Sequence, residues 1–460
     1  SAALAVAVLA ADGAWLYYNT DVLNPYRTEY AQDELHAQYE KLFKPYLAKP
    51  QPKVTGVRIA VDLFPHEHRV TAKATYTLRN KTDKPVEELC LTLPEQLIVH
   101  RMEASIPLKL ADSQRALSWQ RYALARPLAP GDSMTLDFDV EYAPRGFAND
   151  GESRIVVDNG TFINSRYLPH VGYDENMELV QDRDRKRHGL APKPRMHDLD
   201  DAAYHQRNYI TAEGDWIDFD ATISTAPDQF AIAPGRLERE WTGNGRRYFH
   251  YRAPAPILDF YAFLSARYAV KRDEWHGPDK VVPIEIDYQP GHEYNLERMV
   301  SAIKDGFDYY TKNFSPYQYD RVRIVEFPRY AQFAQSFPNT IPYSESIGFI
   351  AKVDPKDPKD IDYPYYVTAH EVAHQWWAHQ VIGADVQGAT MLSETLAQYS
   401  ALMVMKHMYG PDMIRRFLKY ELDRYLRSRG ADPLPEQPLE KVRRDREVLH
   451  ERGRGRARRG

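Results

Sequence analysis

Two histidines with three residues between them constrain this chain more than any other feature. His370 and His374 flank Glu371 in the segment His370-Glu371-Val372-Ala373-His374. Residues four apart lie on one face of an α-helix, so both imidazoles can reach one metal ion, while Glu371 lies beside that ion. Zinc held in this way needs a third protein ligand and an open position for water. The segment therefore predicts one Zn2+ ion bound at a helix.

The flanking residues predict two helices. Pro364 suits a first helical turn, and apolar residues recur at roughly helical spacing from there to Gly383. A second helical pattern covers residues 391–409 and is followed by Gly410, a residue type that commonly ends helices. Glu394 lies in the first turn of this second helix, and we expect it to be the third zinc ligand.

Small residues follow Glu394 along the second helix. Ala397 and Ala401 lie three and seven positions after the carboxylate, which places them on the same face of a regular helix. Such a strip predicts that the second helix packs closely against the first.

A His-Glu-x-x-His match also arises by chance on helices that bind no metal. The spacing to Glu394 favours the metal site over that alternative. Other side chains near the motif receive simpler interpretations: Trp376 and Trp377 as core residues, and His379 as a solvated or capping histidine.

Taken together, these residues resemble the zinc aminopeptidases of the gluzincin clan, which include alanyl aminopeptidase and the leukotriene hydrolase. That family carries a Gly-x-Met-Glu-Asn motif upstream of the zinc helix, on an edge strand, whose Glu grips the free amino terminus of the substrate. Residues 343–350, Tyr-Ser-Glu-Ser-Ile-Gly-Phe-Ile, occupy that place here. The resemblance implies Glu345 as the amine anchor, although Ser344 and Ser346 replace the family's Met and Asn. The alternative is a strand-end glutamate that faces solvent.

The resemblance also implies a mechanism and a substrate. Glu371 would act as the general base toward a zinc-activated water, and the substrate would be a peptide with a free amino terminus. One residue more than is usual in the family separates His374 from Glu394, which a loop can absorb. The family's oxyanion-stabilising Tyr has no counterpart, because no tyrosine follows Tyr425.

Two other functions therefore stay open. One is a catalytically impaired zinc-fold domain that binds or regulates, as part of a membrane transporter-like protein. The other is a zinc endopeptidase, which would not need the free amino terminus of its substrate.

The predicted fold is α+β and multidomain. Residues 1–52 form a membrane-proximal segment and connector, and residues 53–275 alternate apolar and polar positions as half-buried antiparallel strands do. This β domain resembles the saddle-shaped amino-terminal domain of the aminopeptidases. Residues 276–440 suit a thermolysin-like catalytic domain that is truncated at its C-terminus, and the Arg/Gly-rich residues 441–460 are interpreted as a disordered tail, with an RNA- or membrane-binding arm as the alternative.

Charge and cysteine content exclude some classes of protein. The chain has 60 Lys and Arg against 65 Asp and Glu, and 51 against 62 when residues 441–460 are set aside. An acidic body argues against nucleic-acid binding and suits a substrate with a positive amino end. Cys90 is the single cysteine, so no internal disulfide forms.

The N-terminal residues bear on location. Residues 2–10 are small or apolar, and this run is shorter than the about 20 residues that span a bilayer. We interpret it as the remnant of a transmembrane helix, with the end of a signal peptide and an ordinary short helix as the alternatives. The segments 370–377 and 392–399 most resemble a bacterial membrane branch of the family, in which the peptidase domain is fused to an ABC-type permease. That resemblance implies membrane association with an extracytoplasmic catalytic domain. Residues 182–201, dense in charge, are interpreted as a solvated loop or insertion, with a metal cluster as the alternative.

Overall fold

The computed structural model of the chain describes residues 2–24, 26–147, 155–193, 196–211, 213–354, 356–357, 360–431 and 438. The chain forms two compact units: the first comprises residues 1–53, 61–157 and 166–193, and the second comprises residues 54–60, 158–165 and 194–460. Each unit contains helices and more than one sheet, which confirms the α+β multidomain class. The predicted domain bounds and saddle shape stay predictions, and the tail 441–460 lies outside the described residues.

Antiparallel strands make up most of the first unit. In β2 (Arg69–Arg79) and β7 (Ser133–Tyr142) every second residue is buried, as the alternation in the sequence predicted. The two strands pair from Val70 opposite Tyr142 to Arg79 opposite Ser133. The strand orders in this unit are β1-β2-β7-β4 and β5-β6-β3-β9, and residues 54–60 of β1 belong to the second unit. The strands are β1 (Lys53–Phe64), β3 (Val86–Thr92), β4 (Leu97–Ala104), β5 (Leu108–Gln114), β6 (Trp119–Leu128) and β9 (His170–Val171).

Two helices precede these strands. α1 (Ala2–Tyr17) contains the apolar N-terminal run and has no buried residue. No helix in the described part of the chain is both long and apolar enough to cross a membrane. α2 (Glu29–Phe43) covers most of the charged connector, and it is part of the folded unit because Tyr39 and Phe43 are buried around the ring of Trp119.

A third helix corrects the interpretation of residues 182–201. α3 (Asp182–Arg187) carries Arg185, which is only 2% exposed and lies 2.7 Å from the carboxylate of Glu40. A buried guanidinium is stable only with a paired carboxylate. The prediction of a solvated loop is therefore wrong at Arg185.

The second unit places the sequence motifs beside a four-stranded sheet of β16 (Ala269–His276), β17 (Val281–Tyr288), β18 (Val322–Phe327) and β19 (Thr340–Ser344). β17, β18 and β19 are parallel, and β16 is the antiparallel edge strand. All residues of β18 and β19 are buried, as is typical of parallel strands covered on both faces. Glu326 lies opposite Tyr343, so Glu345 follows directly beyond the carboxyl end of β19.

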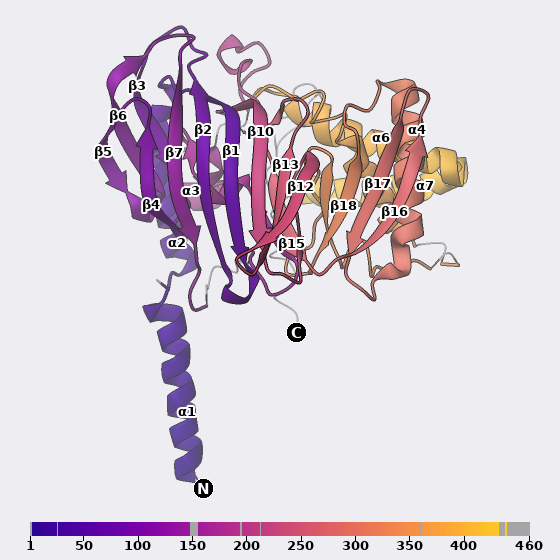
Figure 1. The fold of residues 1–460 in the computed structure, drawn as a ribbon, viewed down its shortest axis with the longest axis horizontal. Coiled ribbons are helices and arrows are strands. Elements are labelled where there is room, and N and C mark those ends of the chain that lie inside the picture. Colours follow the sequence, from indigo (N-terminus) through magenta and orange to yellow (C-terminus); the bar gives the residue numbers. More distant parts are fainter. Residues whose placement is uncertain are drawn as a thin grey trace. The chain divides into compact units, whose positions relative to one another are not determined.

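Four helices complete this part of the second unit: α4 (Leu296–Asn313), α5 (Tyr363–Ala373), α6 (Leu396–Tyr409) and α7 (Pro411–Ala431). Figure 1 shows α4 and α6 behind the parallel sheet. α4 buries Met299, Ile303 and Phe307 at helical spacing.

The remaining strands of the second unit belong to two further sheets. One has the order β12-β13-β10-β1, with β14 beside β10 and with residues 54–60 of β1 in the second unit, and the other has the order β11-β15-β8. The pairs among β8 and β10 to β15 are antiparallel. The strands are β8 (Thr161–Asn164), β10 (Gly214–Thr225), β11 (Phe230–Ile232), β12 (Arg236–Gly243), β13 (Arg246–Arg252), β14 (Ile257–Leu258) and β15 (Ala262–Ala266).

Candidate metal centre

The helix that carries both histidines begins as its sequence predicts. Asp362 precedes α5, and its carboxylate accepts a hydrogen bond from the Tyr365 amide at 3.1 Å. Pro364 lies in the first turn, where its missing N–H costs no helical bond. His370 falls in the last turn, and His374 follows directly as the residue that caps the helix.

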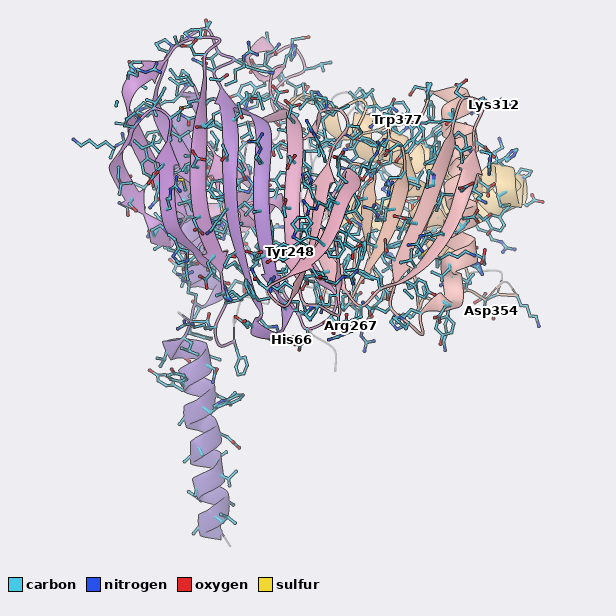
Figure 2. All side chains as sticks on the ribbon, viewed as in Figure 1. His66, Tyr248, Arg267, Lys312, Asp354 and Trp377 are labelled. Carbon is cyan, nitrogen blue, oxygen red and sulfur yellow. The ribbon has the colours of Figure 1, made fainter. Side chains whose placement is uncertain are left out.

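The helix ends earlier than predicted. It stops at Ala373, whereas the apolar spacing continued to Gly383. Ala378 adopts a φ of 147°, which no right-handed helix allows. The prediction was wrong here because the tryptophans are held by tertiary contacts rather than by a helix. Trp377, labelled in Figure 2, lies near α6 and donates its indole N–H to the hydroxyl of Ser400 at 3.0 Å.

This early ending orients one of the imidazoles. The carbonyl of Trp377 lies 3.0 Å from Nδ1 of His374. A carbonyl only accepts hydrogen bonds, so Nδ1 carries the proton, and in the neutral imidazole this leaves the lone pair on Nε2. Neutral imidazole with a backbone partner on its other nitrogen is the usual form of a metal-binding histidine.

Glu394 lies in a widened turn. Residues Met391–Thr395 form a π-helical turn that leads into α6, and Gly410 ends that helix with a φ of 80°. The predicted second helix is thus present over its full extent, with a first turn that differs from a regular α-helix. Single π turns occur often at functional sites.

The structure brings the three predicted zinc ligands together. Nε2 of His370 lies 3.1 Å from Nε2 of His374. Oε2 of Glu394 lies 3.6 Å from the first of these nitrogens and 3.7 Å from the second. Ligand atoms that each lie about 2.0–2.2 Å from one tetrahedral ion are about 3.3–3.6 Å apart. The donor set and its spacing therefore fit zinc.

The three side chains of this triangle differ in their exposure to solvent. The Glu394 side chain is 52% exposed, whereas the histidine side chains are 16% and 10% exposed. Glu371 lies on α5, as His370 does, and its side chain is buried. Within the described residues, Nδ1 of His370 is buried without a hydrogen-bond partner, so no bond at this nitrogen orients the ring.

A distant segment supports the turn that carries Glu394. The hydroxyls of Tyr209 and Ser393 are hydrogen-bonded, and both side chains are buried. The same segment holds the preceding loop, because the carbonyl of Arg207 accepts from the Asp385 amide at 2.8 Å. Sequence reasoning missed Tyr209, since nothing in the local sequence links it to a residue so far along the chain.

We expect Tyr209→Phe to weaken zinc binding about tenfold, because a residue that supports a ligand contributes about 10–100-fold to metal affinity. The variant keeps the ring and removes only the hydroxyl that holds Ser393. Competition with a chromogenic chelator measures the affinity. Tyr294→Phe, at a residue 77% exposed, is the matched control. Equal affinity in both variants would show that the Tyr209 contact does not position the ligand.

Glu345 lies in a second cluster of ionisable groups. Its amide donates to the carbonyl of Phe327 at 2.9 Å, and its side chain is 15% exposed, which does not suit the alternative of a solvent-facing glutamate. Glu345, Glu326 and His292 place one ligand atom each within 4.8 Å of one another. The guanidinium of Arg329 lies 3.8 Å from Glu345. Sequence reasoning missed His292 and Glu326.

His379 differs from its predicted role. It is 3% exposed, and its Nε2 lies 3.1 Å from the carbonyl of Ser336. Burial lowers the pKa of His379 to about 4, which keeps the imidazole neutral. The interpretation as a solvated or capping histidine is wrong, because this side chain is part of the core.

Comparisons with known proteins point to one fold. No known family model matches the sequence, and no curated protein matches it either. Among solved structures, the M1 zinc metallopeptidase from Deinococcus radiodurans aligns with a TM-score of 0.59 and 17% identity, over 89% of this chain and 82% of that chain. A mutant of that enzyme bound to a Tyr-Ser-Ala substrate aligns with a TM-score of 0.56 and 16% identity, over 85% and 78%. The chain therefore has the fold of M1 zinc metallopeptidases.

Proposed function

We propose that this protein is a zinc metallopeptidase whose ion is held by His370, His374 and Glu394. The observation that carries the proposal is the triangle of ligand atoms with sides of 3.1, 3.6 and 3.7 Å. Two neutral imidazoles and one carboxylate are a donor set of catalytic zinc sites, which keep a fourth position open. The likeness in fold to zinc metallopeptidases supports the same function.

Glu371 acts as the general base in this proposal. His370, His374 and Glu394 would hold the zinc ion, which when bound would supply a water of lowered pKa and polarisation of the substrate carbonyl. Glu371 accepts the proton of the attacking water and delivers it to the leaving amine. Its position between the two histidines on α5 supports this assignment.

We further propose that the enzyme is an aminopeptidase, with Glu345 as the anchor of the substrate's ammonium group. Glu345 lies at the end of β19, and a carboxylate binds an ammonium group through charge-assisted hydrogen bonds. The peptide bound to one of the similar structures supports a peptide substrate. Membrane attachment, an extracytoplasmic location and the permease fusion stay predictions, which fractionation of the producing cells tests.

Free and N-acetylated peptides of one sequence test this function. We expect the full chain with zinc to cleave the free peptide, to spare the acetylated one, and to lose activity with a chelator. Glu345→Gln removes the anchoring charge, so we expect KM for the free peptide to rise about tenfold or more. Cleavage of both peptides would identify an endopeptidase instead. Protein that binds zinc but cleaves neither would favour the binding or regulatory domain.

A further inference from the structure

Glu326 is an acidic residue inside a buried parallel strand. It is fully buried in β18, and its Oε2 accepts a hydrogen bond from the Gln289 amide at 2.6 Å. Its Oε1 lies 2.5 Å from Nδ1 of His292. A carboxylate in such a place is costly unless it is protonated or paired. Neither the metal triangle nor the general base makes use of this group.

The environment of Glu326 holds the pKa of its carboxyl group close to neutral pH. Burial raises the pKa of Glu326 to about 7, the hydrogen bonds from Gln289 and His292 lower it, and the charge of Glu345 raises it. The neutral acid therefore prevails below about pH 7 and the carboxylate above it. The polar and ionisable groups that contact Glu326 or Glu345 are His292, Arg329 and Tyr268, whose hydroxyl donates to the main-chain carbonyl of Glu326. Asp287 and Tyr330 act on Tyr268 instead.

We propose that Glu326 is a second carboxylate of the amine site, which acts through Glu345 and releases its proton when a substrate's ammonium group binds. The two carboxyl groups lie within 4.8 Å of each other, so their negative charges repel. An ammonium group on Glu345 removes that repulsion and favours the ionised form of Glu326. Because binding and ionisation are linked, the affinity for the amine increases as the pH rises through neutrality. This inference rests on the proposed amine anchor and adds its regulation by pH.

Glu326 is a positioning residue rather than a catalytic one, because it is enclosed by the protein. Its charge reaches the substrate only through the electrostatic field around Glu345. We therefore expect replacement of Glu326 to change the affinity for the amine and the pH dependence of that affinity. We expect kcat, the rate at which bound substrate is hydrolysed, to stay within about twofold of the unmodified value.

Calorimetry of amine binding tests the inference without hydrolysis. The probe is L-leucinol, an amino alcohol that has no bond to cleave and stays protonated over this pH range. Titrations of the zinc-loaded full chain at pH 6, 7 and 8, in two buffers of different ionisation enthalpy, give the affinity and the number of protons released. For the unmodified protein we expect release of up to one proton near pH 7. We also expect affinity to rise by about tenfold from pH 6 to pH 8, since one pKa unit corresponds to a factor of ten.

Glu326→Gln keeps the shape of the side chain and removes its charge. We expect this variant to release no proton and to bind at pH 8 as weakly as the unmodified protein binds at pH 6. Asp287→Asn is the matched control, because Asp287 is also buried and burial raises its pKa to about 7, yet it lies outside the cluster. This control should keep the proton release.

Three results would overturn the inference: no amine binding by the unmodified protein, binding without proton release, or equal release from Glu326→Gln. A second bound zinc ion that is lost in Glu326→Gln would also overturn it, because the cluster would then be a metal site. If Glu326→Gln fails to fold, the proton count of the unmodified protein still decides. Proton-linked amine binding by a protein without peptidase activity would support this inference while the proposed function fails.

Discussion

Glu371→Gln is expected to lower kcat by about 10²–10⁴-fold, the range that a positioned general base contributes. The amide has nearly the same shape as the carboxylate, but it cannot accept the proton of the attacking water. Because Glu371 is not one of the three side chains that form the metal triangle, bound zinc should stay at one ion per chain. Hydrolysis of an amino-acid arylamide measures kcat, and elemental analysis measures zinc.

Glu297→Gln is the control for this variant, because that side chain is 79% exposed and lies on α4, away from the motif. Normal hydrolysis by Glu371→Gln would exclude Glu371 as the base. Loss of zinc from the same variant would instead assign Glu371 to metal binding.

Glu394→Gln is expected to weaken zinc binding by at least about a hundredfold, and activity should return only when excess zinc is added. The change leaves two imidazoles and a neutral amide, and it removes the single negative charge among the three proposed ligands. The loss should exceed the about 10–100-fold effect of residues that only support a ligand. Chelator competition gives the affinity, and activity as a function of zinc concentration gives an independent value.

Asp412→Asn is the matched control, because the side chain of Asp412 is 93% exposed and lies in the first turn of the next helix. Unchanged zinc affinity in Glu394→Gln would mean that the carboxylate near the imidazoles does not bind the ion.

Much of the candidate metal site could be predicted because its spacing is local. His370 and His374 are one helical turn apart, and a helix brings such residues together whatever the rest of the fold does. Glu394 could be added because it begins the next helical pattern. The alternating strands were predictable for the same reason, since every second residue of β2 and β7 faces the core.

The rest depended on contacts between residues far apart in the chain. The hydroxyl of Tyr209 reaches Ser393 across many intervening residues, and no pattern in either segment indicates this. The early end of α5 depends on where Trp377 packs, which apolar spacing does not reveal. Glu326 did leave a signal, because an acidic residue within a buried strand needs a partner. The sequence could not identify that partner as His292.

The π turn at residues 391–395 separates two tasks that the sequence places on one helical face. Ala397 and Ala401 are fully buried against the protein, while the Glu394 side chain is half exposed. A wide turn rotates less per residue than an α-helix, so the carboxylate falls out of phase with the small residues that follow it. Substitutions that improve the packing of α6 can therefore accumulate without moving the Glu394 carboxylate away from the two imidazoles.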